Sequence, residues 1–480
     1  MQANRRSLAV AIVFLVLVAG TRFYHIGWSI GGDEPTMLAQ VRSVVEKPFF
    51  LRQFGPLDAE GRAYPVPHLL NAVAFRVFGT DEVGSRMGCA IAGVLGITIT
   101  VLVVSRLYGL TNAVVLGMML LLWDWHIYHS QSNRHYSYAF LFATTALLTA
   151  TLGWQRNSFW WALLAGVFSA LAISSHLFTA VVPAGFLLFF LVEAAARRGP
   201  VQKRALWGYV VSGVPLMIIS CGLGLWAFGS WLSPSQGRLD YSVSHSLMGL
   251  SYNLGLGVVV LSMTAWLLAW RKGDASERMW AAVAAVVSVV TVVVPRFLVF
   301  RPDYVFPATV VFFLLASRTL TRAFEDLKSQ SRVLAYGLVV AFFAVPLPSF
   351  LSYYQDGDRH DYRAAAALIK EHLCPGDVIA ADTPMALEYY LNVPVTGVVR
   401  PVADPQACIE ALQKLSASGN RVWYVCRYTR DEPAPDADRW LWEHAVRMRR
   451  FKQKRFDYHE NALDVYLFGS GGSGAKGRDT

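Results

Sequence analysis

Residues 113–153 read AVVLGMMLLLWDWHIYHSQSNRHYSYAFLFATTALLTATLG, which is two apolar runs on either side of a polar turn. Each run approaches the length of about 20 residues that a helix needs to cross a membrane. The turn between them carries Asp124, three histidines and Arg134. Ionisable groups at this depth are costly unless they face a cavity or a partner. The stretch therefore indicates a membrane protein with polar groups gathered at the ends of its helices.

The whole chain has the same apolar character. Of its 480 residues, 54% are hydrophobic and only 16% are charged, and the mean hydropathy is +0.38. One soluble core requires far fewer apolar residues. The segments that approach spanning length are 8–24, 87–104, 113–128, 136–153, 160–173, 178–196, 206–228, 253–270, 279–294, 304–317 and 333–350, eleven in all. The first segment has a second reading as a cleaved signal peptide, because Arg5 and Arg6 precede it.

The basic residues of the short loops predict the orientation. Lys and Arg beside membrane segments are retained in the cytoplasm, and one set of connections, which includes Arg106, Arg271 and Arg322, holds most of them. Residues 1–355 contain 26 basic and 15 acidic residues, whereas residues 356–480 contain 17 and 18. The positive charge is thus a topology signal and does not indicate nucleic-acid binding. We expect a cytoplasmic N-terminus and an extracytoplasmic C-terminal domain.

After Phe350 the pattern changes to short alternating helices and strands. We expect helices at 361–373, 384–391 and 404–416, and strands at 377–381, 395–399, 421–426 and 462–468. Buried-type strands that alternate with helices favour a parallel sheet. The predicted fold class is therefore a polytopic α-helical membrane protein, with about eleven transmembrane helices in residues 1–355 and an extracytoplasmic α/β domain at 356–469. Residues 470–480, rich in Gly and Ser, are expected to be a disordered tail.

Two further features of the outer domain leave alternatives open. Cys374, Cys408 and Cys426 allow one disulfide with one thiol left over, and the sequence does not decide the pairing. The basic run at 447–455 is predicted to be a solvated helix face, with contact to anionic lipid headgroups as the second reading.

The first outer loop, residues 28–86, carries an acid pair and two predicted interfacial helices. Apolar residues recur at helical spacing over 37–45 and 69–78. Asp33 and Glu34 stand at the start of the first of these helices, where an acid is common as an N-cap. The same carboxylates are suited to remove a proton from a hydroxyl. Both readings stay open on local sequence.

Ionisable residues in the other outer turns lie on the same predicted side of the membrane as the acid pair. Asp124 lies about one turn inside the membrane, and its alternative role is a hydrogen bond in helix packing. Arg134 lies on the side where positive charge is disfavoured, and its alternative role is to extend to the membrane interface. Further candidates on the same side are His135, Tyr136, His176, Arg296, Arg301 and Tyr304. Acids that activate a hydroxyl and arginines that hold phosphate fit transfer from a phosphate-linked donor.

Short motifs in this order resemble the GT-C glycosyltransferases. They are the acid pair, SQSNRHY at 130–136, SHLF at 175–178 and RPDYVFP at 301–307. The similarity is closest to the protein mannosyltransferase-related branch, which includes bacterial aminoarabinose transferases and the lipopolysaccharide-core galacturonosyltransferase type. The resemblance implies a GT-C-like protein of the bacterial inner membrane. It also implies a polyprenyl-phosphate sugar as donor, a hydroxyl of a lipid, glycan or protein as acceptor, and inversion at the anomeric carbon.

The same resemblance implies residue roles. Asp33 matches the catalytic base, Glu34 the neighbouring acid, and Asp124 a second outer acid. Arg134 and Arg301 match arginines at the donor phosphate, and His135, Tyr136, His176 and Tyr304 fall where the substrate cavity is expected. Pro302 and Asp303 separate Arg301 from Tyr304, where the family commonly has Arg-Tyr directly. Phosphate binding is therefore expected to be shared with Arg296 or moved to it.

Other functions stay open on the sequence. No cofactor is certain, and the candidate ligands for a divalent metal are Asp33, Asp124, His126 and His129, whose spacing is no recognised metal signature. A transporter or flippase of lipid-linked sugars would use the same outer charges without chemistry, although the chain shows no clear repeated halves. A noncatalytic scaffold would leave the outer arginines without a role.

Overall fold

The structure is a computed structural model that describes residues 2–31, 34–46, 64–196, 202–228, 243–296, 300–357, 359–401, 403–417, 419–429, 435–452 and 461–469. The chain divides into two compact units. The first consists of Met1–Ile26 with Gln40–Phe350, and the second of Gly27–Ala39 with Leu351–Thr480. Asp33 and the tail at 470–480 lie outside the described residues.

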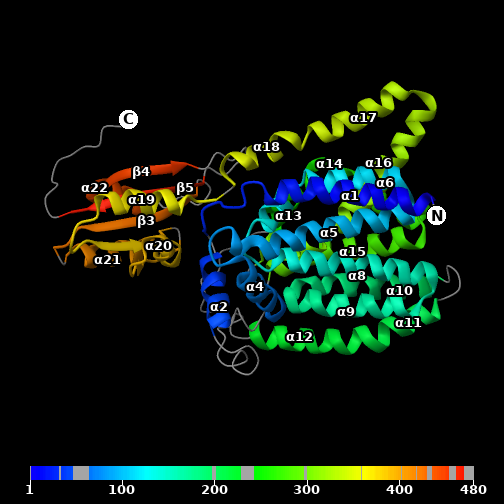
Figure 1. Cartoon of the computed structure of the whole chain (residues 1–480), viewed down its shortest axis with the longest axis horizontal. Coiled ribbons are helices and arrows are strands. Elements are labelled where there is room, and N and C mark those ends of the chain that lie inside the picture. Colours follow the sequence, from blue (N-terminus) through cyan, green and yellow to red (C-terminus); the bar gives the residue numbers. More distant parts are fainter. Residues whose placement is uncertain are drawn as a thin grey trace. The chain divides into compact units, whose positions relative to one another are not determined.

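The first unit is helical throughout its described length (Figure 1). Its elements are α1 (Gln2–Phe23), α4 (Pro65–Phe78), α5 (Gly84–Tyr108), α6 (Leu110–Leu121), α7 (Asp124–Ser130), α8 (Tyr136–Arg156), α9 (Phe159–Ser175), η1 (Leu177–Ala180), α10 (Val181–Ala196), α11 (Lys203–Gly208), η2 (Tyr209–Gly213), α12 (Val214–Phe228), α13 (Val243–Leu254), α14 (Leu256–Lys272), α15 (Ala275–Val293), η3 (Val294–Arg296), η4 (Pro302–Ala308), α16 (Val310–Gln330) and α17 (Arg332–Ala344). Helices α2 (Glu34–Glu46) and α18 (Leu347–Asp356) have residues in both units.

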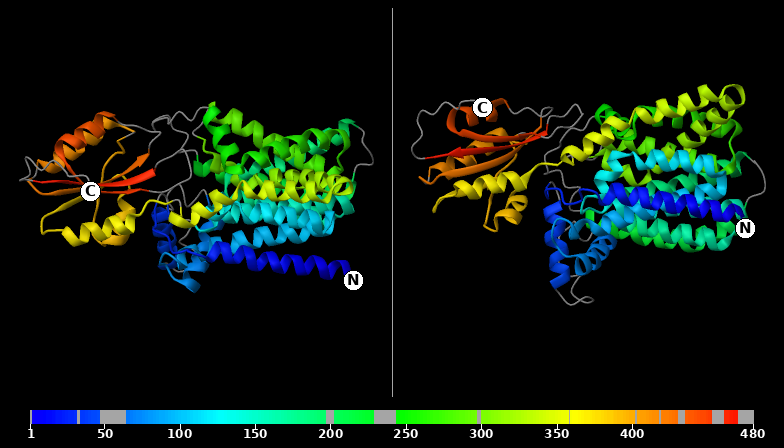
Figure 2. Two further views of the ribbon diagram at one scale, coloured as in Figure 1. Left: turned by 90° about the horizontal axis from the view of Figure 1, so that it is seen from above. Right: turned by 45° about the horizontal axis from the view of Figure 1, so that its top comes forward.

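The long helices of this unit run side by side, as the views in Figure 2 also show. Helix α5 packs against α1 and α8, and α10 packs against α15. Small residues and buried apolar side chains fill these contacts, for example Phe140, Phe186 and Trp280. Side chains that point away from the bundle are also apolar, as Val16, Leu187 and Val333 are. Apolar residues on both faces are what a helix needs when one face meets protein and the other meets lipid.

The chain is a polytopic membrane protein, as its sequence predicts, although its spans are less regular than predicted. Among the described residues, six helices are long and apolar enough to cross a membrane, or up to nine if each bent pair is one span. The bent pairs are α6 with α7 (65°), α13 with α14 (99°) and η4 with α16 (59°). Helix α9 is shorter than a full span, and the segment 206–228 is divided by the π-helical turn η2. The eleven predicted spans are apolar segments of the sequence, and several of these segments do not form single straight helices.

Both predicted helices of the first outer loop are present as α2 and α4. In α4 the apolar residues Leu69, Val73 and Val77 are exposed, whereas His68 and Asn71 are buried. This is the reverse of a water-exposed amphipathic helix, whose polar face points outward. An outward apolar face is the pattern of a helix that lies on lipid.

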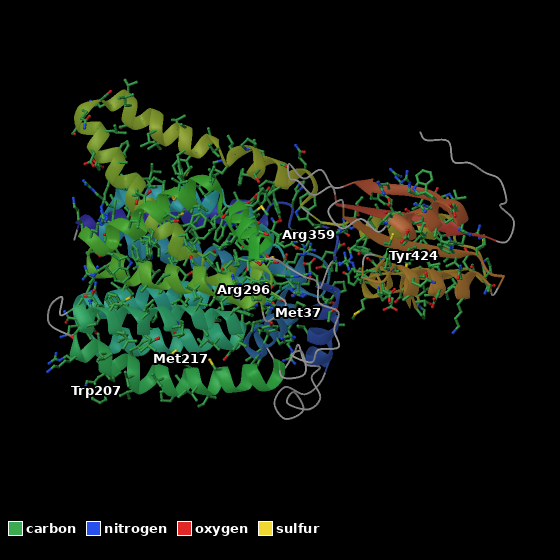
Figure 3. The ribbon with its side chains drawn as sticks, turned by 180° about the vertical axis from the view of Figure 1, so that it is seen from behind. Met37, Trp207, Met217, Arg296, Arg359 and Tyr424 are labelled. Atoms are coloured by element: carbon green, nitrogen blue, oxygen red, sulfur yellow. The ribbon has the colours of Figure 1, made fainter. Side chains whose placement is uncertain are left out.

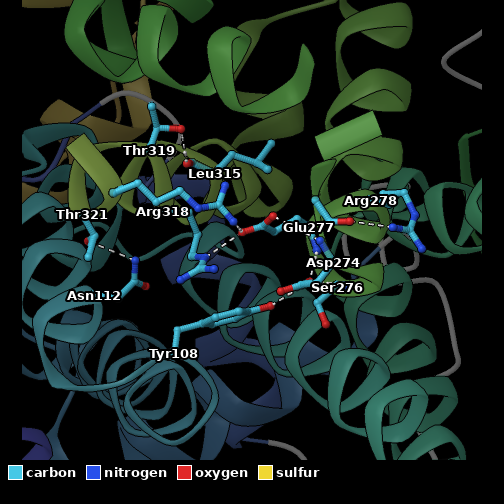
Figure 4. A network of polar contacts seen from close by, with 12 residues as sticks. Tyr108, Asn112, Asp274, Ser276, Glu277, Arg278, Leu315, Arg318, Thr319 and Thr321 are labelled. Atoms are coloured by element: carbon cyan, nitrogen blue, oxygen red, sulfur yellow. Dashed lines mark hydrogen bonds and ion pairs between the residues drawn. The ribbon is translucent and has the colours of Figure 1, made fainter. Parts of the chain in front are cut away.

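A buried polar network joins four helices of the first unit (Figure 4). Glu277 of α15 accepts hydrogen bonds from Arg318 (2.7 Å) and Arg322 (2.5 Å) of α16. Asp274 caps α15 and accepts a hydrogen bond from Tyr108 of α5 (3.3 Å). All these arginines belong to the set that the sequence predicts to be cytoplasmic. The network pairs its charges internally and therefore has a structural role.

The second unit contains a five-stranded sheet in the order β2-β1-β3-β5-β4. Its elements are α19 (Tyr362–His372), β1 (Val378–Ala381), α20 (Pro384–Leu391), β2 (Thr396–Gly397), α21 (Pro405–Ser416), β3 (Val422–Thr429), α22 (Pro435–His444), β4 (Val446–Lys452) and β5 (Asn461–Phe468). Alternate residues of β3 point to opposite faces, so that Trp423 packs with α19 and α20 and Tyr424 packs with α21 and α22. The α/β domain and its predicted strands are confirmed.

The predicted parallel sheet is only partly right. Strand β1 pairs parallel with β2 and β3, but β5 pairs antiparallel with β3 and β4. The basic run is also not a helix face, because its described part forms the edge strand β4. Arg450 pairs there with the buried Asp464 of β5 at 2.7 Å. A row of basic side chains suits an exposed sheet edge, since charge prevents pairing with another chain.

The cysteines of the second unit form no disulfide. All five cysteines of the chain are free, with Cys374 exposed and Cys408 and Cys426 buried. Burial raises the pKa of the Cys408 and Cys426 thiols, which are therefore protonated at neutral pH. The disulfide that the sequence left open is not present.

Candidate functional site

The turn with the largest number of candidate residues begins at a break between α6 and α7. A helix that ends at Leu121 leaves carbonyl groups without partners inside the bundle. Arg22 of α1, which is fully buried, donates hydrogen bonds to the carbonyl oxygens of Leu120 (2.7 Å) and Leu121 (2.9 Å). The charge of Arg22 also suits the negative end of the helix dipole. The break is thus stabilised by a residue that the sequence analysis did not single out.

The next residues of the turn stabilise α1 in return. The side-chain amide of Gln131 donates to the carbonyl oxygens of Arg22 (3.1 Å), in the last turn of α1, and of Tyr24 (2.7 Å), just after it. Close approach of α5 to α7 depends on Gly93, because a Cβ there would lie 2.2 Å from Ser130 Oγ. The first residues of the SQSNRHY motif, Ser130 and Gln131, therefore fix the turn. The residues from Arg134 onward provide the candidate site.

Five rings meet where this turn leads into α8, and we call them the His–Tyr cluster: Tyr64, His135, Tyr136, His176 and Tyr304. Tyr64 stacks on His135 with ring centroids 4.0 Å apart and lies 5.6 Å from His176. His135 lies 4.9 Å from His176, and His176 lies 5.6 Å from Tyr304. The structure thus brings together the four residues predicted for the substrate cavity. With Tyr64, the five rings come from four chain segments that are far apart in sequence.

The two histidines of the His–Tyr cluster have no hydrogen-bond partner among the described residues. Both ring nitrogens of His135 and of His176 are buried and unpaired. His176 lies between two spanning segments, and its burial lowers its pKa to about 3, so the imidazole is neutral at pH 7. A neutral imidazole offers one donor and one acceptor. Buried polar groups are normally paired, so these imidazole nitrogens are suited to bind a polar ligand.

The guanidinium group of Arg134 is next to the cluster. Its central carbon lies 6.0 Å from the ring centroid of Tyr136, within cation–π range. Its backbone carbonyl accepts a hydrogen bond from Cys89 Sγ at 3.1 Å. Arg134 therefore adds positive charge beside two neutral imidazoles, which is the combination that a phosphate oxygen needs.

Three residues at this site were missed by the sequence analysis. Tyr64 precedes α4 and belongs to none of the apolar segments, so no periodicity marked it. His68 of α4 is buried one turn later, and its Nδ1 lies 2.8 Å from the Tyr64 carbonyl oxygen. Asp303 appeared only as an interruption between Arg301 and Tyr304. Its carboxylate accepts a hydrogen bond from Trp125 Nε1 at 2.9 Å and lies 3.4 Å from His129 Nε2.

Asp124 is the first residue of α7. Its carboxylate accepts a hydrogen bond from the Trp125 backbone at 2.7 Å and another from the Ser349 hydroxyl. These bonds match the alternative reading of Asp124 as a packing residue. A catalytic role for Asp124 remains a prediction.

Arg296 and Arg301 flank a short gap in the described chain, and both are exposed. Arg296 ends η3, and Arg301 precedes η4, where its carbonyl accepts a hydrogen bond from the Tyr304 backbone at 3.0 Å. Arg296 and Trp207 lie toward opposite ends of the helical unit (Figure 3). This agrees with the predicted separation of Arg296 from the basic loops near 203–204.

The acid pair belongs to the second unit, and only Glu34 of it is described. Helix α2 begins at Glu34, and the predicted position of Asp33 lies outside the described residues. Glu34 forms a salt bridge with Arg359 at 2.6 Å, and the two side chains are only 4% and 5% exposed. The Gly31 backbone also donates to Glu34 at 3.4 Å. The Glu34 carboxylate is therefore already engaged by a guanidinium group.

The described residues do not fit the metal site that the sequence left open. They contain no group of three or more His, Cys, Asp or Glu side chains that could hold a metal ion. His126 Nδ1 lies 3.3 Å from the Arg22 guanidinium, whose charge would repel a bound cation. His129 turns instead to Asp303. Asp33, the remaining candidate ligand, lies outside the described residues.

Comparison with known proteins gives a family match for part of the chain and a fold for nearly all of it. Residues 62–223 match the PMT_2 family, described as dolichyl-phosphate-mannose-protein mannosyltransferase. The structure is similar to the crystal structure of ArnT from Cupriavidus metallidurans in the apo state, with a TM-score of 0.55 and 15% identity over 96% of this chain and 97% of that one. The chain has the GT-C fold. No curated protein matches it in sequence.

Two further solved structures have the same GT-C architecture. ArnT from Cupriavidus metallidurans bound to undecaprenyl phosphate matches with a TM-score of 0.55, 15% identity and coverage of 96% of this chain and 97% of that one. The Archaeoglobus fulgidus oligosaccharyltransferase in complex with Zn and sulfate matches with a TM-score of 0.52, 13% identity and coverage of 87% and 67%. The predicted resemblance to GT-C proteins is therefore confirmed at the level of fold. Three members of the His–Tyr cluster that the motifs contribute (His135, Tyr136, His176) and Tyr64 fall inside the matched residues 62–223.

Proposed function

We propose that this GT-C protein transfers a sugar from a polyprenyl-phosphate donor to a hydroxyl group on the extracytoplasmic side of the membrane, with inversion at the anomeric carbon. The observation that carries the proposal is the pair of buried, unpaired imidazoles of His135 and His176 beside Arg134. A structurally similar protein, ArnT from Cupriavidus metallidurans, has been crystallised with undecaprenyl phosphate bound. The family matched by residues 62–223 is named for a lipid-phosphate-linked sugar donor.

In the proposed reaction the carboxylate of Asp33 accepts the proton of the acceptor hydroxyl. The hydroxyl oxygen then bonds to the anomeric carbon, and the bond between that carbon and the phosphate oxygen breaks. The electron pair leaves with the polyprenyl phosphate, whose charge Arg134, Arg296 and Arg301 stabilise. Glu34 stabilises the first outer loop through its ion pair with Arg359. Asp124 is proposed as a second acid at the site, and the steps above do not use it.

A transporter of lipid-linked sugars is the second candidate, and one observation favours it. Transporters often bind their substrate where helices are broken, and the described part of this chain has three bent helix pairs. One break, at α6 and α7, is stabilised by Arg22 and leads directly to the His–Tyr cluster. A transporter would bind the lipid-linked sugar at this break and release it intact, whereas a transferase would split it.

The His176→Phe variant tests the donor site. Phenylalanine keeps the ring contacts of His176 and removes two unpaired nitrogens, so we expect folding to be retained. We expect the affinity for undecaprenyl phosphate to fall about tenfold, the usual cost of a lost hydrogen bond to a charged group. Native mass spectrometry in nanodiscs measures the affinity. His372→Phe, at an exposed position of α19, is the matched control, and equal affinities of the two variants would contradict the assignment.

Neutralising the outer arginines tests the phosphate contact. Arg301→Gln is expected to weaken binding of a polyprenyl-phosphate sugar about tenfold or more, with Arg296→Gln having this effect instead if the phosphate site has shifted. Arg271→Gln, at an exposed position in the last turn of α14, is expected to bind normally. Lipid-donor binding is measured for the three variants in the same nanodisc. A similar loss in all three would indicate general destabilisation.

A further inference from the structure

Asp303 is a charged residue near the His–Tyr cluster that the reaction proposed above does not use. It lies on η4, the short 3-10 helix that is bent by 59° from α16. Pro302 begins this helix, and a Cβ at Gly249 of α13 would lie 2.8 Å from Pro302 Cγ. Helix α13 therefore packs directly on the residue before Asp303 and holds the start of η4 in place.

The carboxylate of Asp303 is engaged on one of its two oxygens. Oδ1 accepts a hydrogen bond from Trp125 Nε1 at 2.9 Å and lies 3.4 Å from His129 Nε2. Within the described part of the chain, no residue forms a hydrogen bond or an ion pair with Oδ2. The Asp303 side chain is 36% exposed, whereas that of His129 is 2% exposed. The contacts of Oδ1 thus fix the orientation of the carboxylate, and Oδ2 can accept hydrogen bonds from a ligand.

Aromatic side chains pack next to the engaged oxygen. The ring centroids of His129 and Phe306 lie 4.3 Å apart, and those of Trp125 and Phe306 lie 5.0 Å apart. All three side chains are buried. Sites for small molecules combine such rings with a few polar groups that fix the orientation of the ligand. A carboxylate oxygen beside aromatic rings suits a sugar, which has hydroxyl groups to donate hydrogen bonds and apolar C–H groups to pack on a ring.

Tyr136 connects this group of residues to the proposed phosphate contact. Its ring centroid lies 4.5 Å from that of His129 and 6.0 Å from the central guanidinium carbon of Arg134. Asp303 also directly precedes Tyr304 of the His–Tyr cluster. A sugar that is joined to a phosphate at Arg134 would therefore lie next to Asp303.

We propose that Asp303 determines the specificity for the donor sugar, because its Oδ2 accepts a hydrogen bond from one of the sugar hydroxyl groups. The sugar class is one without an acidic group, since a uronic acid would bring a second carboxylate next to Asp303 and like charges in contact oppose binding. The inference rests on the proposed function for the identity of the ligand, a polyprenyl-phosphate sugar. It does not depend on the chemical step.

The affinities for undecaprenyl phosphate with and without a sugar test this role. The wild type and Asp303→Asn are placed in phosphatidylcholine nanodiscs. Native mass spectrometry then measures binding of undecaprenyl phosphate and of its glucose-, galactose-, mannose- and galacturonic-acid-linked forms. Asparagine keeps an oxygen for Trp125 Nε1 and replaces Oδ2 by an amide nitrogen, which cannot accept a hydrogen bond. We expect Asp303→Asn to bind the preferred non-acidic donor about tenfold more weakly than the wild type, and undecaprenyl phosphate equally well.

The sugar-free lipid separates a contact with the sugar from a structural role, because a structural role would weaken the binding of both lipids alike. Asp326→Asn, at an exposed position of α16, is the matched control and is expected to bind every lipid as the wild type does. We also expect the wild type to bind the galacturonic-acid-linked form about tenfold more weakly than the preferred non-acidic donor. Asp303→Asn is expected to reduce that difference.

Two kinds of result would overturn the assignment of Asp303. The first is an Asp303→Asn variant that binds every donor as the wild type does, or that loses as much affinity for undecaprenyl phosphate as for the sugar-linked forms. The second is a wild type that prefers the galacturonic-acid-linked form, or that binds no non-acidic donor of this set more tightly than undecaprenyl phosphate. Failure of the proposed function is a different result, the absence of sugar transfer from a donor that binds.

Discussion

The Asp33→Asn variant is expected to lose sugar transfer by about 10²- to 10⁴-fold, the contribution of a general base. Asparagine is about as favourable as aspartate at the start of a helix, so this change removes the basic oxygen and is expected to leave folding intact. Donor binding and expression are expected to stay near those of the wild type. Transfer is measured with purified protein and a polyprenyl-phosphate sugar under saturating donor.

Glu34→Gln is the comparison for that result. The Glu34 carboxylate is already engaged by Arg359, so its loss is expected to slow the chemical step less than the loss of Asp33. Near-normal turnover of Asp33→Asn would reduce Asp33 to an N-cap. A larger loss for Glu34→Gln than for Asp33→Asn, at equal folded fraction, would move the base to Glu34.

Removal of Arg359 is expected to have the largest effect on stability. Arg359→Gln leaves the carboxylate of Glu34 buried without its countercharge, and breaking one partner of a buried ion pair costs about 3–5 kcal/mol. The free energy of unfolding of the second unit is measured in the full-length protein by its tryptophan fluorescence. Arg439→Gln, at an exposed position of α22, is the matched control and is expected to be neutral.

The double variant Glu34→Gln/Arg359→Gln separates charge from packing. It removes both charges, so we expect it to recover most of the stability that Arg359→Gln loses. If the double variant is as unstable as the single one, the contribution of Arg359 comes from packing and not from the pair. If Arg359→Gln unfolds like the wild type, the buried ion pair is not formed.

Much of this fold follows from local pattern. Continuous apolar runs predict the helical segments of the first unit, and alternation of short helices and strands predicts the second. Patterns of this kind predict how many segments there are but not where a helix bends. The break after Leu121 depends on Arg22, a residue 99 positions earlier in the chain. The basic run at 447–455 predicts a helix face, whereas its described part forms β4, because pairing with β5 is a contact that local spacing does not contain.

The site was predictable where it is built from short motifs. The motif at 130–136 and His176 indicated the polar turns, and the structure brings them together in the His–Tyr cluster. Tyr64 was missed because a single aromatic before a helix has no pattern of its own. The grouping of residues 27–39 with the C-terminal unit was also missed, since the contacts of Gly31 with Tyr362 and of Glu34 with Arg359 join segments more than 300 residues apart.

The fate of the lipid-linked sugar tests the central claim most directly. Purified wild-type protein in nanodiscs is incubated with undecaprenyl-phosphate-linked sugar and envelope acceptors, and mass spectrometry follows both the intact donor and free undecaprenyl phosphate. The account predicts that undecaprenyl phosphate appears in step with a glycosylated acceptor of inverted anomeric configuration, and that Asp33→Asn abolishes both. Donor that is bound and crosses the bilayer with its sugar still attached, and no release of undecaprenyl phosphate, would contradict it and identify a transporter.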